Sequence, residues 1–231
     1  MIGHIDSIET LGLVDGPGVR VVVFLQGCPL RCLFCHNPET WNIDDKTLIS
    51  AEDLVRHIYK YRNYFGESGG VTFSGGEPLF QHDFLLECLK LCKKMGINTC
   101  LDTSGVGKYE DILDYVDLVI WDIKATKNDL YKYITEASIN ASLEFLDYCQ
   151  KKGKKMWLRQ VIVPGINDNI DYIYELKEFI KPLKNIEKVE LLPYHLLGVS
   201  KYEKLGIPYK LKGVPAMSKS DCDELYKILM S

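Results

Sequence analysis

Short apolar runs rich in β-branched residues alternate along this chain with longer segments in which apolar residues recur at helical spacing. The first pattern predicts buried strands, and the second predicts helices that each bury one face. Six strands are predicted, at residues 19–25, 70–73, 98–101, 118–121, 156–163 and 189–192. Six helices are predicted between and after them, at residues 51–65, 82–95, 109–115, 139–152, 170–180 and 219–230.

Two of the predicted helices carry end signals. Ser50 precedes the helix at 51–65, with Asp53 three residues further on, which is typical of a helix N-terminus. The helix at 82–95 is expected to stop at Gly96. Its apolar face is expected to consist of Phe84, Leu85, Cys88, Leu89 and Cys92.

Six strand-then-helix units in series predict parallel strands with helices packed outside them. Segments such as VRVVVFL and VELL are apolar at consecutive positions, as expected of strands covered on both faces. A closed eight-unit barrel needs about 250 residues, whereas this chain has only 231. We therefore expect an α/β fold, a partial (β/α)6 TIM-like barrel, with residues 1–231 forming one domain.

Polar or glycine-rich residues follow every predicted strand. In chain order these segments are QGCPLRCLFCH, SGGEP, DTSG, DIK, PGIND and PYH. The carboxyl ends of parallel strands meet at one rim of a barrel, where such folds carry their chemistry. The sequence therefore predicts an active site at this rim.

Composition narrows the choice of partner and compartment. Hydrophobic residues make up 46% of the chain and charged residues 26%, which is ordinary for a globular protein. The net charge of −4 gives no reason to expect nucleic acid or an anionic membrane as a partner. No apolar run approaches the roughly 20 residues of a membrane helix, and the N-terminus lacks the pattern of a secretory signal. We therefore expect a cytoplasmic protein.

The eight cysteines are then expected to be reduced, because the cytosol keeps thiols reduced. Cys28, Cys32 and Cys35 form the pattern C-x-x-x-C-x-x-C, a spacing that lets thiolates of one loop converge on a metal centre. Three thiolates are one short of saturating a four-iron cubane. A metal centre with an open position is a site for chemistry.

Three other interpretations of this pattern stay open at this point. One is structural zinc, with His36 or a distant residue as the fourth ligand. Another is a c-type haem, since residues 32–36 match C-x-x-C-H, although the export that haem attachment normally needs has no signal here. The third is a set of buried, inert thiols, which Pro29 and Arg31 beside the cysteines disfavour.

The other five cysteines are scattered along the chain. Cys88 and Cys92 lie four apart on a predicted helix, a spacing that could hold a metal, but they share the apolar face with Leu85 and Leu89. Core packing is the expected role of these two, because free cysteine buries readily. No function is assigned to Cys100, Cys149 or Cys222.

The cysteine pattern, with Phe34 between its second and third cysteines, resembles the radical S-adenosylmethionine superfamily. More narrowly, DGPGVR, GCPLRCLFCHNPETW, SGGEP, CLDTSG, DIK and LLPYH resemble, in order and spacing, the activating enzymes of glycyl radical enzymes. The resemblance runs from about Ile2 to His195. It implies a radical SAM core in which the three cysteines hold a [4Fe–4S] cluster, with the fourth iron chelated by the amino and carboxylate groups of S-adenosylmethionine.

The resemblance also assigns roles to rim residues that have plainer explanations on their own. Gly76 would meet the cofactor's amino group, where a plain turn is the alternative. Asp122 and Lys124 point to the same side of an extended segment and would face the cofactor, where a surface ion pair is the alternative. The implied cofactor-binding set is Phe34, Cys35, His36, Gly76, Asp122, Ile123, Lys124 and His195, with Arg159 and Asn37 as weaker candidates.

Two further sites are implied by the same resemblance. Asp102, Thr103 and Asp122 would supply oxygens to a monovalent cation. Asp15 and Gly16, whose surroundings also suit an ordinary tight turn, would contact the glycine-bearing loop of a partner enzyme.

The implied function is the activation of a glycyl radical enzyme. S-adenosylmethionine would be cleaved reductively to methionine and a 5′-deoxyadenosyl radical, which takes hydrogen from a glycine Cα of pyruvate formate-lyase. A one-electron donor, flavodoxin or ferredoxin, and a monomeric chain are expected with it.

Three alternatives to this function remain. An activator of a different glycyl radical enzyme often carries a cysteine-rich insertion after the first motif, whereas no cysteine lies between Cys35 and Ser74. A 7-carboxy-7-deazaguanine synthase, a small-molecule radical enzyme, is disfavoured by the DGPG and PETW segments. The third alternative is a zinc-binding module without enzymatic activity.

Overall fold

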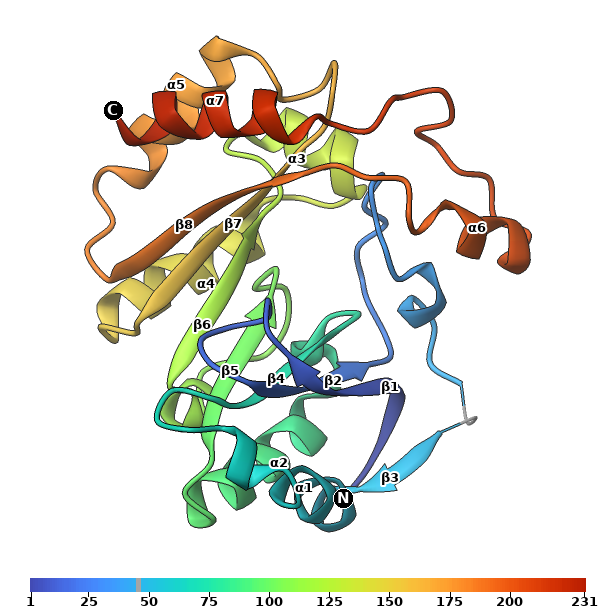
Figure 1. Cartoon of the computed structure of the whole chain (residues 1–231), viewed down its shortest axis with the longest axis vertical. Coiled ribbons are helices and arrows are strands. Elements are labelled where there is room, and N and C mark those ends of the chain that lie inside the picture. The colour runs from blue at the N-terminus through green and yellow to red at the C-terminus, as the bar shows by residue number, and fades with distance from the viewer. Residues whose placement is uncertain (45–46) are drawn as a thin grey trace.

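The computed structural model of the chain describes residues 1–44 and 47–231, and its strands form a single sheet. The parallel strands are β2 (Arg20–Leu25), β4 (Gly70–Gly75), β5 (Asn98–Thr103), β6 (Leu118–Ile123), β7 (Met156–Ile162) and β8 (Ile186–Pro193). Two antiparallel strands, β1 (Ile2–Gly12) and β3 (Leu48–Ser50), extend the sheet beyond β2. The order is β3-β1-β2-β4-β5-β6-β7-β8, so β3 and β8 are the two edges. Figure 1 shows the sheet bending from β1 in the lower half of the view to β8 in the upper half, with α1 and α2 below it and α5 and α7 above it.

All six predicted strands are confirmed, and only their ends differ from the prediction by a few residues. The partial (β/α)6 fold is confirmed with them. The strands β1 and β3 were not predicted. In β1 apolar and polar residues are mixed, and Gly3 is needed where the strand crosses the Phe84 ring, which a Cβ would approach to 2.3 Å.

The helices follow the prediction less closely. Five are confirmed: α1 (Ala51–Tyr59), α2 (His82–Lys94), α4 (Asn140–Lys151), α5 (Ile170–Ile180) and α7 (Lys219–Met230). Of these, α1 is shorter than the predicted 51–65, and a separate 3-10 turn follows it at Arg62–Tyr64. The helix predicted at 109–115 is wrong, because only a short 3-10 turn, Leu113–Tyr115, forms before the chain returns to β6. Two short helices, α3 (Asn128–Thr135) and α6 (Val199–Leu205), were not predicted.

The two faces of the parallel strands differ sharply in polarity. On the outer face, residues such as Val21, Phe73 and Trp121 pack with the helices into one large apolar core. The inner face carries a small apolar cluster of Cys100, Leu118 and Ile120. It also carries many polar residues, among them Arg20, Thr72, Ser74, Asp102, Asp122, Arg159 and Glu190. The fold therefore presents polar groups to the inside of the curved sheet.

The five scattered cysteines are free and buried. Cys88 and Cys92 lie in the large apolar core, as predicted, together with Cys149 and Cys222. Cys100 belongs to the small inner cluster. Their burial accounts for them as packing residues.

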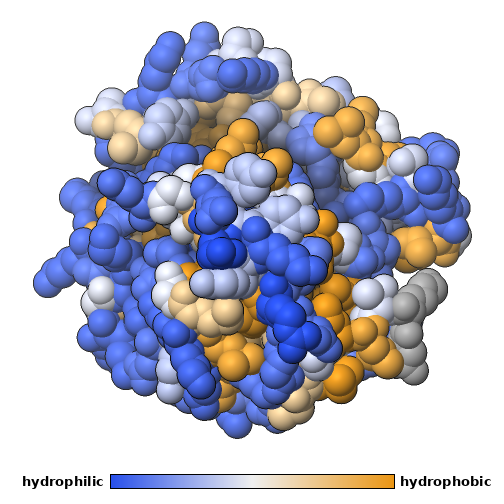
Figure 2. All heavy atoms as spheres, turned by 60° about the horizontal axis from the view of Figure 1, so that its bottom comes forward, coloured by the Kyte–Doolittle hydropathy of each residue, from blue (hydrophilic) through white to orange (hydrophobic). Residues whose placement is uncertain are grey.

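The outer surface is mainly hydrophilic on the face seen in Figure 2, where apolar side chains gather in separate patches between charged ones. Among the helices of residues 1–44 and 47–231, none has the length and apolar character needed to cross a membrane.

The predicted start of α1 supplies a test of local stability. Ser50 caps the helix, and its Oγ accepts a hydrogen bond of 3.1 Å from the Asp53 amide. Ser50→Ala leaves that amide without its partner, so we expect the free energy of unfolding to fall by about 1 kcal/mol in a urea titration. Ser7→Ala is the control, because the exposed Ser7 hydroxyl only donates to Asp6. Equal losses in the two variants would contradict the capping role.

Candidate active site

A cavity of about 260 Å³ opens at the carboxyl ends of the parallel strands. Its wall is built by the segments at the ends of β2, β4, β5, β6 and β8, as the sequence predicted for the rim. The sixth predicted segment, PGIND after β7, does not line this cavity. The lining side chains include Cys28, Cys32, Phe34, Cys35, His36, Asn37, Ser74, Gly76, Glu77, Asp102, Thr103, Asp122, Lys124 and His195.

Most of the predicted site residues are therefore brought together in one cavity. Ile123 is the exception within the cofactor set, because its side chain is buried in the outer apolar core. Successive residues of a strand face opposite sides, so Asp122 and Lys124 face inward and Ile123 cannot. Only its backbone remains available to a ligand. Asp15, Gly16 and Arg159 do not line this cavity either.

The cysteine loop is held by backbone hydrogen bonds at both of its ends. The amide of Cys28 donates to Trp41 O at 3.1 Å. Further along, the amides of Arg31 and Leu33 donate to the carbonyls of Thr135 and Ile134, at 3.0 and 2.9 Å. These carbonyls end α3 and would otherwise lack partners. The unpredicted helix α3 is thus part of the support for the loop.

The three thiols in this cavity are free, and burial raises their pKa values. The pKa of Cys28 rises to about 12 and that of Cys32 to about 11. Thiolates would form here only if positive charge entered the cavity, as iron bound by cysteine provides. The donor set therefore fits an iron–sulfur cluster.

The zinc interpretation had His36 as a possible fourth ligand. Within residues 1–44 and 47–231, no group of three or more His, Cys, Asp or Glu side chains is gathered to hold one metal ion. His36 packs against His195 instead, with ring centroids 3.8 Å apart. Burial lowers the pKa of His36, and the neighbouring His195 adds to that effect.

The Gly75-Gly76 pair lets two loops of the site meet. Gly75 has a φ of +113°, and the Gly76 amide donates to Leu25 O at 2.8 Å. A Cβ on Gly76 would lie 2.5 Å from the carbonyl oxygen of Gly27, next to Cys28. The close backbone approach that these glycines allow is made to the cysteine loop. The contact between Gly76 and the cofactor's amino group stays a prediction.

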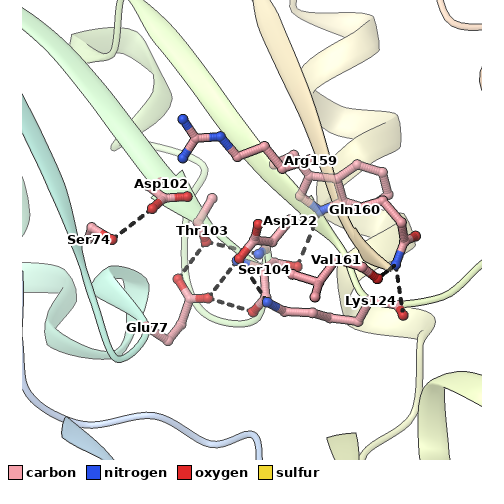
Figure 3. Close-up of polar contacts among 12 residues, drawn as sticks. Ser74, Glu77, Asp102, Thr103, Ser104, Asp122, Lys124, Arg159, Gln160 and Val161 are labelled. Atoms are coloured by element: carbon pink, nitrogen blue, oxygen red, sulfur yellow. Dashed lines mark hydrogen bonds and ion pairs between the residues drawn. The ribbon is translucent and has the colours of Figure 1, made fainter. Parts of the chain in front are cut away.

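Glu77 is a site residue that the sequence analysis did not single out. Its buried carboxylate accepts hydrogen bonds from the Ser104 amide at 2.9 Å and the Ser104 hydroxyl at 2.6 Å. The Thr103 hydroxyl and the Leu79 amide also donate to it. Burial raises the pKa of Glu77, and these donors oppose the rise. Figure 3 shows the carboxylate joining the ends of β4 and β5. The signal was the position of this glutamate after two rim glycines.

The Asp122–Lys124 pair faces the cavity, with Nζ and Oδ2 2.7 Å apart. The pair lies inside the site, since the Lys124 side chain is only 12% exposed. The surface ion pair considered as an alternative is therefore wrong. Burial alone would lower the pKa of Lys124, but Asp122 and Cys32 raise it above its ordinary value. Its ammonium group also lies 5.7 Å from the centre of the Phe34 ring.

The three residues predicted to bind a cation lie at the cavity wall. The Asp102 carboxylate accepts a hydrogen bond of 2.7 Å from Ser74. Burial and the nearby Asp122 raise the pKa of Asp102 to about 7, against the influence of Arg159. The Thr103 hydroxyl already donates a hydrogen bond to the Glu77 carboxylate. The cation site stays a prediction.

Arg159 lies on the inner face and joins several acidic groups. Its Nε donates to Glu190 at 3.0 Å, and its Nη1 is 3.7 Å from the Asp15 carboxylate. Another nitrogen donates to the carbonyl of Val14. Burial raises the pKa of Asp15, and Arg159 opposes this. Arg159 thus ties the loop between β1 and β2 to the inside of the sheet.

The segment after β8 completes the wall beside the cysteine loop. His195 lies against His36, and the Tyr202 hydroxyl donates to Cys35 O at 3.0 Å. Lys201 donates to the side chain of Asn37 at 2.9 Å. Tyr202 and Lys201 belong to α6, so this unpredicted helix also holds the cysteine loop.

The fold and the cavity with three cysteines define a class of enzyme. A sequence model of the radical SAM superfamily matches residues 22–180, and the chain belongs to that superfamily. It is a radical SAM enzyme, and the expected cofactors, a [4Fe–4S] cluster and S-adenosylmethionine, are those of the family. The zinc and haem interpretations of the cysteine pattern are thereby set aside.

Within the superfamily, curated relatives carry one particular name. The chain is 50% identical to the pyruvate formate-lyase-activating enzyme of Clostridium pasteurianum, over 99% of this chain and 98% of that protein. It is 42% identical to the pyruvate formate-lyase 1-activating enzyme of Escherichia coli K12, over 99% and 96%.

Solved structures share the fold at lower identity. A domain of a pyruvate-formate lyase-activating enzyme from Bacteroides vulgatus has a TM-score of 0.58 at 24% identity, covering 70% of this chain and 93% of that one. Streptococcus suis SuiB bound to its precursor peptide SuiA has a TM-score of 0.70 at 19% identity, covering 96% and 46%.

The raised pKa of Asp102 predicts how stability depends on pH. The folded apoprotein keeps this proton up to about pH 7, whereas the ordinary value for aspartate is 3.8. The folded state binds the extra proton between these values, so its stability decreases as pH rises through that window. Asp102→Asn removes the effect. We therefore expect the Tm of the variant to rise relative to the parent between about pH 5 and about pH 8.

The measurement is calorimetry of the apoprotein with choline as the only added cation, because a bound cation would lower the carboxyl pKa. Asp147→Asn is the control, since that carboxylate is exposed and paired with Lys151. A constant difference in Tm between Asp102→Asn and the parent would show that Asp102 is already ionised at the lower pH.

Proposed function

We propose that this chain activates pyruvate formate-lyase by generating a glycyl radical in it. The observation that carries the proposal is the placement of three free thiols in one cavity at the carboxyl ends of parallel strands. The partner is taken from the names of relatives that are 50% and 42% identical over nearly the whole chain. The same full-length similarity supports this partner over another glycyl radical enzyme or a small-molecule substrate.

In this proposal Cys28, Cys32 and Cys35 each bind one iron of the [4Fe–4S] cluster. No fourth cysteine lines the described cavity, so one iron is left for S-adenosylmethionine. When bound, the cluster and S-adenosylmethionine supply a low-potential electron and a 5′-deoxyadenosyl radical. The protein binds and orients both groups and shields them from water.

The inward-facing ion pair suits the methionyl part of the cofactor. Asp122 and Lys124 offer one acidic and one basic group to the cavity, and S-adenosylmethionine carries an amino and a carboxylate group. Gly76 would contact the amino group through its backbone, and Ile123 would contribute only its backbone. Phe34, His36 and His195 provide the aromatic wall that we assign to the adenine side.

The remaining expectations complete the proposal. Residues 1–231 act as one radical SAM domain, supported by β8 and α7, which lie beyond the matched segment and complete the sheet and its outer layer. The chain acts as a monomer in the cytoplasm and receives its electron from flavodoxin or ferredoxin. Asp102, Thr103 and Asp122 bind a monovalent cation, which would relieve the repulsion between the two carboxylates. Asp15 and Gly16 contact the glycine loop of the partner.

The partner is tested by EPR under anaerobic conditions. The reconstituted protein is incubated with dithionite, S-adenosylmethionine and purified pyruvate formate-lyase, and a glycyl radical doublet is expected. Parallel samples contain other glycyl radical enzymes. A doublet in one of those enzymes together with none in pyruvate formate-lyase would reject the proposed partner.

The cluster ligands are tested by a pair of cysteine variants. Cys32→Ala should lose most of the roughly four irons that a [4Fe–4S] cluster carries and should not cleave S-adenosylmethionine. Cys88→Ala is the control, because Cys88 is fully buried in the apolar core away from the cavity. It should keep its iron and cleavage activity while losing about 1 kcal/mol of stability. Full iron content in Cys32→Ala would contradict the assignment.

A further inference from the structure

Arg20, at the start of β2, is fully buried, yet the acceptors around it are all uncharged. Its Nε donates to the Thr72 hydroxyl at 2.8 Å. Its other nitrogens donate to the carbonyls of Pro17 at 3.0 Å and Val71 at 2.8 Å. Burial lowers the pKa of this guanidinium group. A buried charge needs every donor satisfied, and here the satisfied donors tie the loop before β2 to two neighbouring strands.

Thr72, on the adjacent strand β4, links Arg20 to the loop before β2 through its hydroxyl group. Its hydroxyl accepts from Arg20 and donates to the carbonyl of Asp15 at 2.5 Å. The side chain is fully buried, so no water competes for this position. Arg20 and Thr72 thus form a continuous chain of hydrogen bonds that ends on the backbone of Asp15.

Three carbonyls of this short loop are held by buried side chains. Val14 O accepts from Arg159, Asp15 O from Thr72, and Pro17 O from Arg20. Between them, Gly16 has a φ of +124°, and a Cβ there would lie 2.9 Å from the Arg20 side chain. Buried side chains therefore hold the backbone at Val14, Asp15 and Pro17, and there is no space for a side chain at Gly16.

The side chains at the start of this loop face the opposite way. Leu13 and Val14 are 71% and 74% exposed. A loop whose backbone is already fixed loses little further conformational freedom when a partner binds to its exposed side chains. Such preorganisation favours binding of a partner at this loop.

We propose that Arg20 and Thr72 are positioning residues that hold the loop of Asp15 and Gly16 in the shape that binds the glycine loop of the partner enzyme. This inference rests on the proposed function, in which that loop contacts pyruvate formate-lyase. Neither residue lines the cavity of the cysteines, so neither is placed to contact S-adenosylmethionine bound there.

The test is Thr72→Val, which keeps the shape of the side chain and removes the hydroxyl. The yield of glycyl radical, measured by EPR, is followed against the concentration of purified pyruvate formate-lyase. We expect the KM for this partner to rise about tenfold while kcat at saturation changes by less than about twofold, because only the bound shape of the loop is lost. Hydrogen exchange of residues 13–18 should become faster in the free protein.

Thr99→Val is the matched control. Thr99 is also fully buried, and its hydroxyl donates to the carbonyl of Tyr115 at 2.7 Å, in a different loop. It should lose similar stability without a change in KM. Thr72→Ser restores a hydroxyl and should return the KM close to that of the parent. Should Thr72→Val not fold, Arg20→Lys replaces it, since a lysine cannot make the fork of hydrogen bonds.

The outcomes separate this inference from the proposed function. An unchanged KM in the folded Thr72→Val or Arg20→Lys variant overturns the inference, and so does an equal rise in Thr99→Val. A rise that Thr72→Ser does not reverse also counts against it. If instead the parent enzyme generates no radical in pyruvate formate-lyase, that result rejects the proposed function, and with it the inference that rests on that function. Asp15→Asn should raise the KM if the loop contacts the partner at all.

Discussion

The structure depends on keeping charged groups paired on the inner face of a sheet whose outer face is sealed by apolar helices. The charges there are satisfied in two ways. Arg159 is neutralised by Glu190 and Asp15, and Lys124 is neutralised by Asp122. Arg20 and Glu77 are satisfied by uncharged hydrogen-bonding groups alone. Because unpaired charges are so costly inside a protein, these pairings determine where the loops of the site can lie.

The same pairings form two groups, one near the starts of the parallel strands and one at their carboxyl ends. Near the starts of the strands, Arg20 and Thr72 fix the loop between β1 and β2. At the ends of the strands, Glu77 joins β4 to β5, and Gly76 allows the cysteine loop to rest against them. Arg159 connects the two groups, because it pairs with Asp15 of the loop and also lowers the pKa of Asp102 near the cavity. A cofactor site and a partner site can therefore sit at neighbouring positions without sharing side chains.

The sequence predicted the features that depend on local pattern, and it failed where a distant contact decides. The six parallel strands and the cysteine loop are each encoded by a short continuous run of residues, so they could be predicted from the sequence. The side chain of Ile123 lies in the outer core, because it alternates with the inward-facing Asp122 and Lys124, so its cofactor contact stays a prediction for the backbone alone. Helix α6 spans only Val199–Leu205, and it is stabilised by contacts such as Tyr202 to Cys35 that no local pattern encodes. Glu77 was missed for the same reason, because its donors lie on the next strand.

The cavity itself is built to receive positive charge. Burial raises the pKa of Cys28, Cys32, Cys35 and Asp102, so these acidic groups tend to keep their protons. Lys124 is the one lysine or arginine among the residues that line the described cavity. Its charge is largely taken up by Asp122. Iron or a sulfonium group entering this space would meet groups able to give up protons and become negative. Binding and proton release would then be linked, because the buried thiols must lose their protons before they can bind a cation.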